Sequence, residues 1–415
     1  SWDRGANWTA LKNNFPTVPV DDIEIQAREN DLVLATHGRS IWVFDDLTPI
    51  EKMDSNVATS PLTFFPPRPA ITWHLGNRRW SGGQKAFTAK NPPYGALLSY
   101  YLKEAMPAET PKKDGEEKDK KDAVEEKSKT DTKGDAAEKK EGKVKITVLD
   151  KDGKVIREMD GPAAVGVNRT NWDLRFNPPA EPTPEQQEAI AAGFGFGPRG
   201  PFVEPGEYTV KIKAADKEAS QKVMIEEDTR IVISAADRTA RREMIEQLYP
   251  MAKSTDKDRK TIEGIQTALK TAREQWKKDK DAGKPGTTKI PDDIVKAADE
   301  LQKRVDAVAE KFIRTREGLG NAGPPFEWRP DPLPNQVQEL LDDLDGFSAA
   351  PSGHQKEKLA ELMQLVNDAS AQVKKIADEE LPALNKKMND AGIPHIVPAP
   401  PQPRGGRGGE VESEQ

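Results

Sequence analysis

The sequence contains no cysteine, which excludes disulfide bonds, thiolate metal sites and a cysteine nucleophile. It has no run of about 18 apolar residues, so a membrane-spanning helix is not expected. Acidic residues outnumber basic ones and give a formal net charge of -7 at pH 7, which argues against a general affinity for nucleic acid.

Apolar residues are scarce, at 35% of the 415 residues, and charged residues are plentiful, at 32%. Globular chains have about 45–50% apolar and about 25% charged residues, so either the cores are small or part of the chain lies outside any core. A chain of this length forms roughly two to four domains of about 100–200 residues each.

Residues 1–50 carry the pattern of short β-strands. Apolar and polar residues alternate over 22–27, and two apolar runs follow over 31–36 and 40–44 after tight turns. Three strands bury too little surface to be stable alone, so we expect neighbouring structure to cover this meander. Residues 51–90 are rich in proline and tryptophan and predict a connector, with one short strand near 70–75.

Residues 91–234 predict a β-sandwich, because short alternating runs recur between turn residues. The expected strands lie near 96–102, 144–149, 154–159, 167–176, 207–213, 218–226 and 230–233. A Lys- and Glu-rich insert over 107–143 interrupts the sandwich. It has almost no large apolar side chain to offset its chain entropy, so we expect it to be disordered. A mixed-charge docking segment is the alternative.

Residues 235–391 have apolar residues at helical spacing, which predicts an α-helical bundle or a long helical hairpin. The expected helices span 238–252, 256–280, 291–317, 336–344 and 355–390, with Pro250 kinking or splitting the first two. The Pro- and Gly-rich residues 392–415 are expected to be disordered. The fold class is therefore a multidomain α+β protein.

The first eight residues fit the pattern Ser-x-Asp-x-Gly-x-x-Trp, with Ser1, Asp3, Gly5 and Trp8 at the fixed positions. In such a turn Asp3 accepts hydrogen bonds from backbone N–H groups and Gly5 supplies a positive φ. Trp8 is expected to bury its ring against the sheet. These roles are structural, so Asp3 is not expected to be a catalytic acid.

The motif resembles the Asp-box, or BNR repeat, of sialidases and sortilin-like β-propellers. Residues 30–47, which read Asn-Asp-Leu-Val-Leu-Ala-Thr-His-Gly-Arg-Ser-Ile-Trp-Val-Phe-Asp-Asp-Leu, look like the last blade of a bacterial sortilin-like family. In that family an Ig-like domain and a helical region follow the propeller. The resemblance covers roughly residues 1–390. It implies a partial propeller blade over 1–50, an Ig-like sandwich over 91–234 and the family's helical region over 235–391.

Two candidate ligand contacts, His37 and Arg39, lie at a strand–strand turn. Propellers present binding groups on such turns, so the two side chains are expected to contact an anionic or carbohydrate ligand. In the alternative interpretation, Gly38 makes the turn and Arg39 pairs with Asp45 or Asp46.

Two further candidates, Trp73 and Arg79, belong to an aromatic and basic segment suited to stacking on sugar rings. The alternative is that this segment packs between the propeller and the next domain. No metal site is predicted. The run 150–153 is expected to be a hairpin turn rather than a calcium loop, and Asp342, Asp343 and Asp345 a solvated helix end.

The resemblance implies a non-catalytic C-terminal part of an exported β-propeller protein, periplasmic or extracellular. It would bind a protein, peptide or glycan ligand through the propeller, without a cofactor. Further blades and a signal peptide are expected upstream, because the sequence begins at Ser1. The alternative is a sialidase-type glycoside hydrolase whose catalytic residues lie in those upstream blades.

Deletion of residues 107–143 is expected to leave the melting temperature of the chain nearly unchanged, because the insert buries almost nothing. Calorimetry of the full chain and the deletion variant tests this, and a fall of many degrees would mean that the insert packs against a core.

Overall fold

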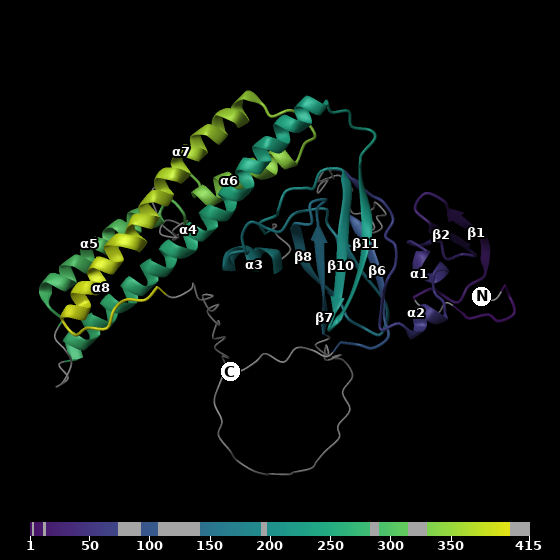
Figure 1. The fold of residues 1–415 in the computed structure, drawn as a ribbon, viewed down its shortest axis with the longest axis horizontal. Helices are drawn as coiled ribbons and strands as arrows, with labels where there is room; N and C mark the ends of the chain where they lie inside the picture. Colours follow the sequence, from purple (N-terminus) through teal and green to yellow (C-terminus); the bar gives the residue numbers. More distant parts are fainter. Residues whose placement is uncertain are drawn as a thin grey trace, which may run out of the picture. The chain divides into compact units, whose positions relative to one another are not determined.

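The computed structural model describes residues 1, 4–10, 14–73, 93–106, 142–191, 197–282, 290–313 and 330–398. It contains both sheets and helices, as expected for an α+β protein (Figure 1). The chain divides into two compact units: unit 1 comprises Ser1–Arg175 and Val203–Asp228, and unit 2 comprises Phe176–Phe202 and Thr229–Gln415. The predictions of disorder for 107–141 and for 399–415 lie outside the described residues. In the described parts of the two segments they are wrong, because Lys143 begins a strand and Ile393 and Ile396 are buried in the helical core.

Unit 1 begins with a three-stranded antiparallel meander in the order β1-β2-β3. The strands span Val20–Gln26, Asp31–Thr36 and Ile41–Phe44, which confirms the three predicted runs. Asn30, with φ 56°, and Gly38, with φ 75°, adopt left-handed conformations in the two turns, where Asn and Gly are favoured. Two short helices follow, α1 (Thr48–Glu51) and α2 (Ser55–Thr59).

Two further sheets of unit 1 pack against each other. One has five strands in the order β5-β11-β10-β7-β8, and the other has three in the order β4-β6-β9. The strands are β4 (Leu62–Phe64), β5 (Ala70–Thr72), β6 (Ala96–Leu102), β7 (Lys143–Leu149), β8 (Val155–Pro162), β9 (Gly166–Trp172), β10 (Gly206–Ala214) and β11 (Lys217–Glu227).

Aromatic side chains join the two sheets through the core. Trp172 of β9 is fully buried, and its ring meets that of Tyr208 of β10 edge to face at 5.6 Å. Tyr100 of β6 donates its hydroxyl hydrogen to the carbonyl oxygen of Pro162 of β8 at 2.5 Å. Burial raises the pKa of Tyr100 well above its usual range, so the phenol stays a donor and its buried oxygen carries no charge.

The sandwich differs from the sequence prediction at its boundaries. β4 pairs with β6, and β5 pairs in parallel with β11, so residues assigned to a connector belong to both sheets. The strand predicted over 167–176 ends at Trp172, because Leu174 has a positive φ of 56°. Residues 230–233, expected to be the last strand, form no strand and lie in unit 2.

Unit 2 is built from helices whose apolar faces meet in one core. They are α4 (Ala235–Ala282), α5 (Asp292–Ala309), α6 (Leu333–Asp345), α7 (Gly353–Lys375) and α8 (Leu381–Asp390), with a π-helical turn over Ile376–Glu380. Of the two outcomes expected at Pro250, the split is wrong, since α4 continues through the proline with buried Leu248 and Ala252 beside it. The π turn ends two residues before Pro382, which cannot donate the N–H of a regular helix.

Residues 176–202, here called the arm, leave the sandwich and belong to unit 2, although the sequence analysis placed them in the sandwich. The arm contains helix α3 (Pro184–Ala191). Thr183 and Gln186 bond reciprocally through side chain and backbone, at 2.9 and 3.3 Å, directly before and within α3. This capping box, with Pro184 at the first helical position, is a sequence signal for the start of α3.

Gly95 is expected to tolerate no side chain, because it has φ 113° and an added Cβ would lie 2.0 Å from the carbonyl oxygen of Trp172. Gly95→Ala should lower the free energy of unfolding by more than about 3 kcal/mol, measured by urea denaturation. Gly38→Ala is the control, with φ 75° and open space around it, and should cost only about 1–2 kcal/mol. Equal losses in the two variants would contradict the assigned β6–β9 packing.

Candidate functional site

The turn between β2 and β3 carries both predicted contact residues at the surface. His37 donates its backbone N–H to the carbonyl oxygen of Pro19 at 3.0 Å, and its Nδ1 lies 3.3 Å from Oδ2 of Asp21. The carbonyl oxygen of Arg39 accepts from Nε1 of Trp42 at 3.1 Å. The backbone of the turn is therefore held on both sides, while the side chains of His37 and Arg39 remain exposed.

The alternative interpretation of this turn is confirmed in one part and wrong in the other. Gly38 has the positive φ that the turn requires. Asp45 and Asp46, however, follow β3 at the end opposite the turn, and the side chain that reaches them is that of Arg169.

The opening motif is only partly described, because Asp3 lies outside the described residues. Gly5 has φ 93°, as expected, and donates its N–H to Oγ of Ser1 at 2.6 Å. Trp8 is 80% exposed, so the expectation that its ring is buried against the sheet is wrong for this chain. The ring lies beside its own turn instead, since a Cβ on Gly5 would be 3.7 Å from Cζ2 of Trp8.

The two aromatic-segment candidates do not join His37 and Arg39 in one site. Trp73 follows β5, meets the ring of Tyr94 edge to face at 5.3 Å, and donates its backbone N–H to the hydroxyl of Tyr94 at 3.3 Å. This favours a packing role for Trp73 within unit 1. Arg79 lies outside the described residues.

Arg169 of β9 attaches the meander to the sandwich, a role that sequence reasoning missed. Its Nη1 and Nη2 donate to the carbonyl oxygens of Asp45 and Asp46 at 2.5 and 2.6 Å. The guanidinium lies 5.1 Å from the ring centroid of Phe44. Burial lowers the pKa of Arg169, against the opposing effect of the Asp46 and Asp45 carboxylates. Arginine nevertheless stays protonated at any ordinary pH.

Arg68 makes the second attachment, at the β1–β2 turn and the start of β2. Its Nη1 donates to the carbonyl oxygen of Glu29 at 2.7 Å and to Oδ1 of Asp31 at 3.0 Å. The same Asp31 oxygen accepts the backbone N–H of Asp46 at 2.9 Å. Arg68 and Arg169, with Glu29, Asp31 and Asp46, are here called the arginine clasp.

The meander has apolar side chains on both faces, because alternate residues of a strand point to opposite sides. The register places Ile23, Ile25, Leu32, Leu34, Trp42 and Phe44 on face A, and Val33, Ala35, Ile41 and Val43, with Asp22 and Glu24, on face B. Each face is partly exposed in this chain: Ile23 is 62% exposed on face A and Ile41 is 66% exposed on face B. On face A the rings of Trp42 and Phe44 are in contact with Phe15 and Arg169, respectively.

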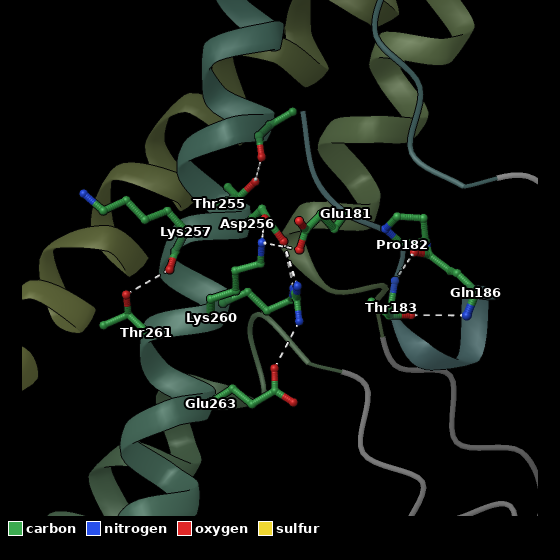
Figure 2. A network of polar contacts seen from close by, with 12 residues as sticks. Glu181, Pro182, Thr183, Gln186, Thr255, Asp256, Lys257, Lys260, Thr261 and Glu263 are labelled. Carbon is green, nitrogen blue, oxygen red and sulfur yellow. Dashed lines mark hydrogen bonds and ion pairs between the residues drawn. The ribbon is translucent and has the colours of Figure 1, made fainter. Parts of the chain in front are cut away.

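A polar network in unit 2, buried at Asp256 and exposed at Glu181, links the arm to α4 (Figure 2). Asp256 is 7% exposed and accepts from Nη2 of Arg259 at 2.7 Å, while Lys260 lies 3.1 Å from Asp256 and 3.4 Å from Glu181 of the arm. Burial lowers the pKa of Lys260, but the hydrogen bonds and charges of Asp256 and Glu181 outweigh it, so the pKa is raised. Arg259 also pairs with Glu263 at 3.1 Å. Since these charges are paired with one another, the network has a structural role and stabilises the packing of the arm on α4.

The described residues contain no cluster of three or more His, Asp or Glu that could hold a metal ion. Asp342, Asp343 and Asp345 bind separate partners, namely Gln338, Gln355 and the backbone N–H of Phe202. In the run 150–153, Asp150 accepts the backbone N–H groups of Asp152 and Lys154, which confirms a hairpin turn. Within the described ranges, no helix has the length and apolar content needed to cross a membrane.

Comparison with known proteins leaves the family open. No protein-family model matches the sequence, and no curated protein matches it. The likeness to sortilin-like propellers therefore stays a prediction, and the candidate site is defined by its geometry.

Arg169→Met is expected to loosen the meander, because two carbonyl oxygens lose charged donors and no apolar side chain can replace them. The free energy of unfolding should fall by at least about 2 kcal/mol, and hydrogen exchange of the β2 and β3 amides should accelerate. Arg28→Met is the control, since Glu29 is the one ion-pair partner of Arg28 among the described residues and the Arg28 side chain is 65% exposed. If both variants exchange at the wild-type rate, the clasp does not hold the meander.

Proposed function

We propose that this chain is a non-catalytic C-terminal part of an exported sortilin-like β-propeller protein, and that it binds a protein, peptide or glycan ligand. The observation that carries the proposal is the apolar character of both faces of the meander. An antiparallel sheet at the surface of a domain has one apolar face and one solvated face. A propeller blade packs between two other blades and therefore needs two apolar faces.

In this proposal the meander is the last blade, and the two packed sheets of unit 1 are the Ig-like domain. The helices of unit 2 are the helical region that follows in that family. The arginine clasp supports this order, because it joins the meander to β9 through backbone groups at the end of β3. The blade is thereby attached at one end and leaves its two faces available to neighbouring blades.

The proposed ligand contacts are His37 and Arg39 on the β2–β3 turn. Arginine offers planar, paired donors that suit a carboxylate, and histidine adds a second donor or acceptor. The exposed side chains project from a backbone that is hydrogen-bonded to Pro19 and Trp42. An anionic or carbohydrate ligand would therefore bind to a turn whose backbone conformation is already fixed.

The carboxylates of the arginine clasp support a non-catalytic role. A glycosidase needs one carboxyl group that donates a proton and a second across the sugar. Asp31 instead accepts from Arg68 and from the backbone of Asp46, and Asp46 accepts the backbone N–H of Thr48. The carboxylates of Asp31 and Asp46 therefore stabilise the local fold of the meander. A glycoside hydrolase would require other residues.

The double variant His37→Ala/Arg39→Ala is expected to abolish ligand binding by the full chain without changing its melting temperature. The labelled chain is applied to an array of sialylated and neutral glycans and to an array of extended peptides. Lys151→Ala, at the exposed β7–β8 hairpin turn, is the matched control and should bind as the wild type does. Folded wild-type chain that binds neither array would overturn the proposal. Hydrolysis of 4-methylumbelliferyl sialoside by the chain would overturn its non-catalytic part.

A further inference from the structure

The outer edge of β1 is a feature that neither the arginine clasp nor the β2–β3 turn uses. β1 is the terminal strand in the sheet order β1-β2-β3, and all seven of its residues are exposed. A terminal strand presents a row of backbone N–H and C=O groups that another strand can pair with.

The backbone of Ile23 faces this outer edge. Its N–H donates to Oδ1 of Asp22 in the same strand at 2.9 Å. Ladder hydrogen bonds in an antiparallel pair alternate along each strand, so the N–H and C=O of Ile25 face the same edge as those of Ile23. A carbonyl oxygen of an incoming strand can take the place of the Asp22 carboxylate at Ile23.

The side chains of β1 define which strand fits. Ile23 and Ile25 point to face A, and Asp22 and Glu24 point to face B. β1 reads Val-Asp-Asp-Ile-Glu-Ile-Gln and has no basic residue. An added strand would therefore place apolar side chains beside the two isoleucines and basic side chains beside the two acids, and each such cross-strand pair is stabilising.

Two alternatives fit less well, namely a second copy of the chain at β1 and an added strand at β3. A second copy pairing through β1 would set Asp22 and Glu24 opposite the same acids, which is destabilising. β3, the terminal strand on the other side, has four residues, Ile-Trp-Val-Phe, and no charge with which to select a partner. The length and the charge pattern both single out β1.

We propose that the outer edge of β1 binds an extended peptide of another protein, in which β-branched apolar residues alternate with lysine or arginine. The peptide adds a fourth strand to the meander, with backbone hydrogen bonds at Ile23 and Ile25 and ion pairs at Asp22 and Glu24. The inference rests on the proposed binding function and names a peptide as the ligand class.

The probe is a fluorescein-labelled heptapeptide of alternating lysine and valine, titrated into the full chain and followed by anisotropy. Asp22→Lys/Glu24→Lys should weaken its binding about tenfold or more and should create binding of the matching glutamate–valine peptide. Glu226→Lys/Glu357→Lys changes the net charge equally at exposed acids of β11 and α7 and should leave both affinities unchanged. N-methylation of alternate amides of the peptide should abolish binding, because it removes the backbone donors of one edge. In the complex, hydrogen exchange at Ile23 and Ile25 should slow.

The results separate this inference from the proposed function. Binding of the lysine–valine peptide that survives the reversal at Asp22 and Glu24, or that tolerates N-methylation, would overturn the β1 site. No binding of that peptide would overturn it as well. In either case, array binding that depends on His37 and Arg39 would leave the proposed function standing.

Discussion

The guanidinium of Arg169 donates to the carbonyl oxygens of Asp45 and Asp46, and together with Arg68 it attaches the meander to the rest of unit 1. A buried guanidinium is costly unless its donors are satisfied, so the loop after β3 has to present its carbonyl groups in one conformation. Asp46 adopts a φ of 52° and is 2% exposed, and Asp31 accepts its N–H. The attachment is polar and directional, and apart from the ring of Phe44 it leaves the apolar faces of the meander uncovered.

This polar attachment at the ends of the strands has a physical consequence for function. Where a sheet is attached through its apolar face, the face is consumed by packing. Here the attachment uses the ends of strands, so Ile23 on face A and Ile41 on face B stay exposed. Contiguous exposed apolar surface is typical of interaction sites. The proposed blade packing and the proposed peptide edge use different parts of the same sheet, its faces and its outer edge.

Unit 2 uses buried polar groups in a similar way. Arg241 is 8% exposed and donates to the carbonyl oxygen of Leu344 at 3.0 Å, and Asp345 accepts the N–H of Phe202 at 2.9 Å. The arm is fixed to the bundle by the contact of Phe202 with Asp345 and by that of Glu181 with Lys260. The chain has 35% apolar residues, and hydrogen-bonded buried polar groups help to define how its helices pack.

Local periodicity in the sequence was enough to predict the three strands of the meander and most strands of the sandwich, since alternation and turn residues act over a few neighbours. It also predicted the helices of unit 2, although it missed α1, α2 and α3 and divided α4 into two runs near Pro250. It placed His37 and Arg39 on a turn. Tertiary structure alone decided that β4 and β5 join the sandwich, that the arm belongs to unit 2, and that Arg169 reaches Asp45 and Asp46. The reason is that these outcomes depend on groups far apart in the chain, and a single sequence records which side chains are present but not which distant carbonyl oxygens they meet.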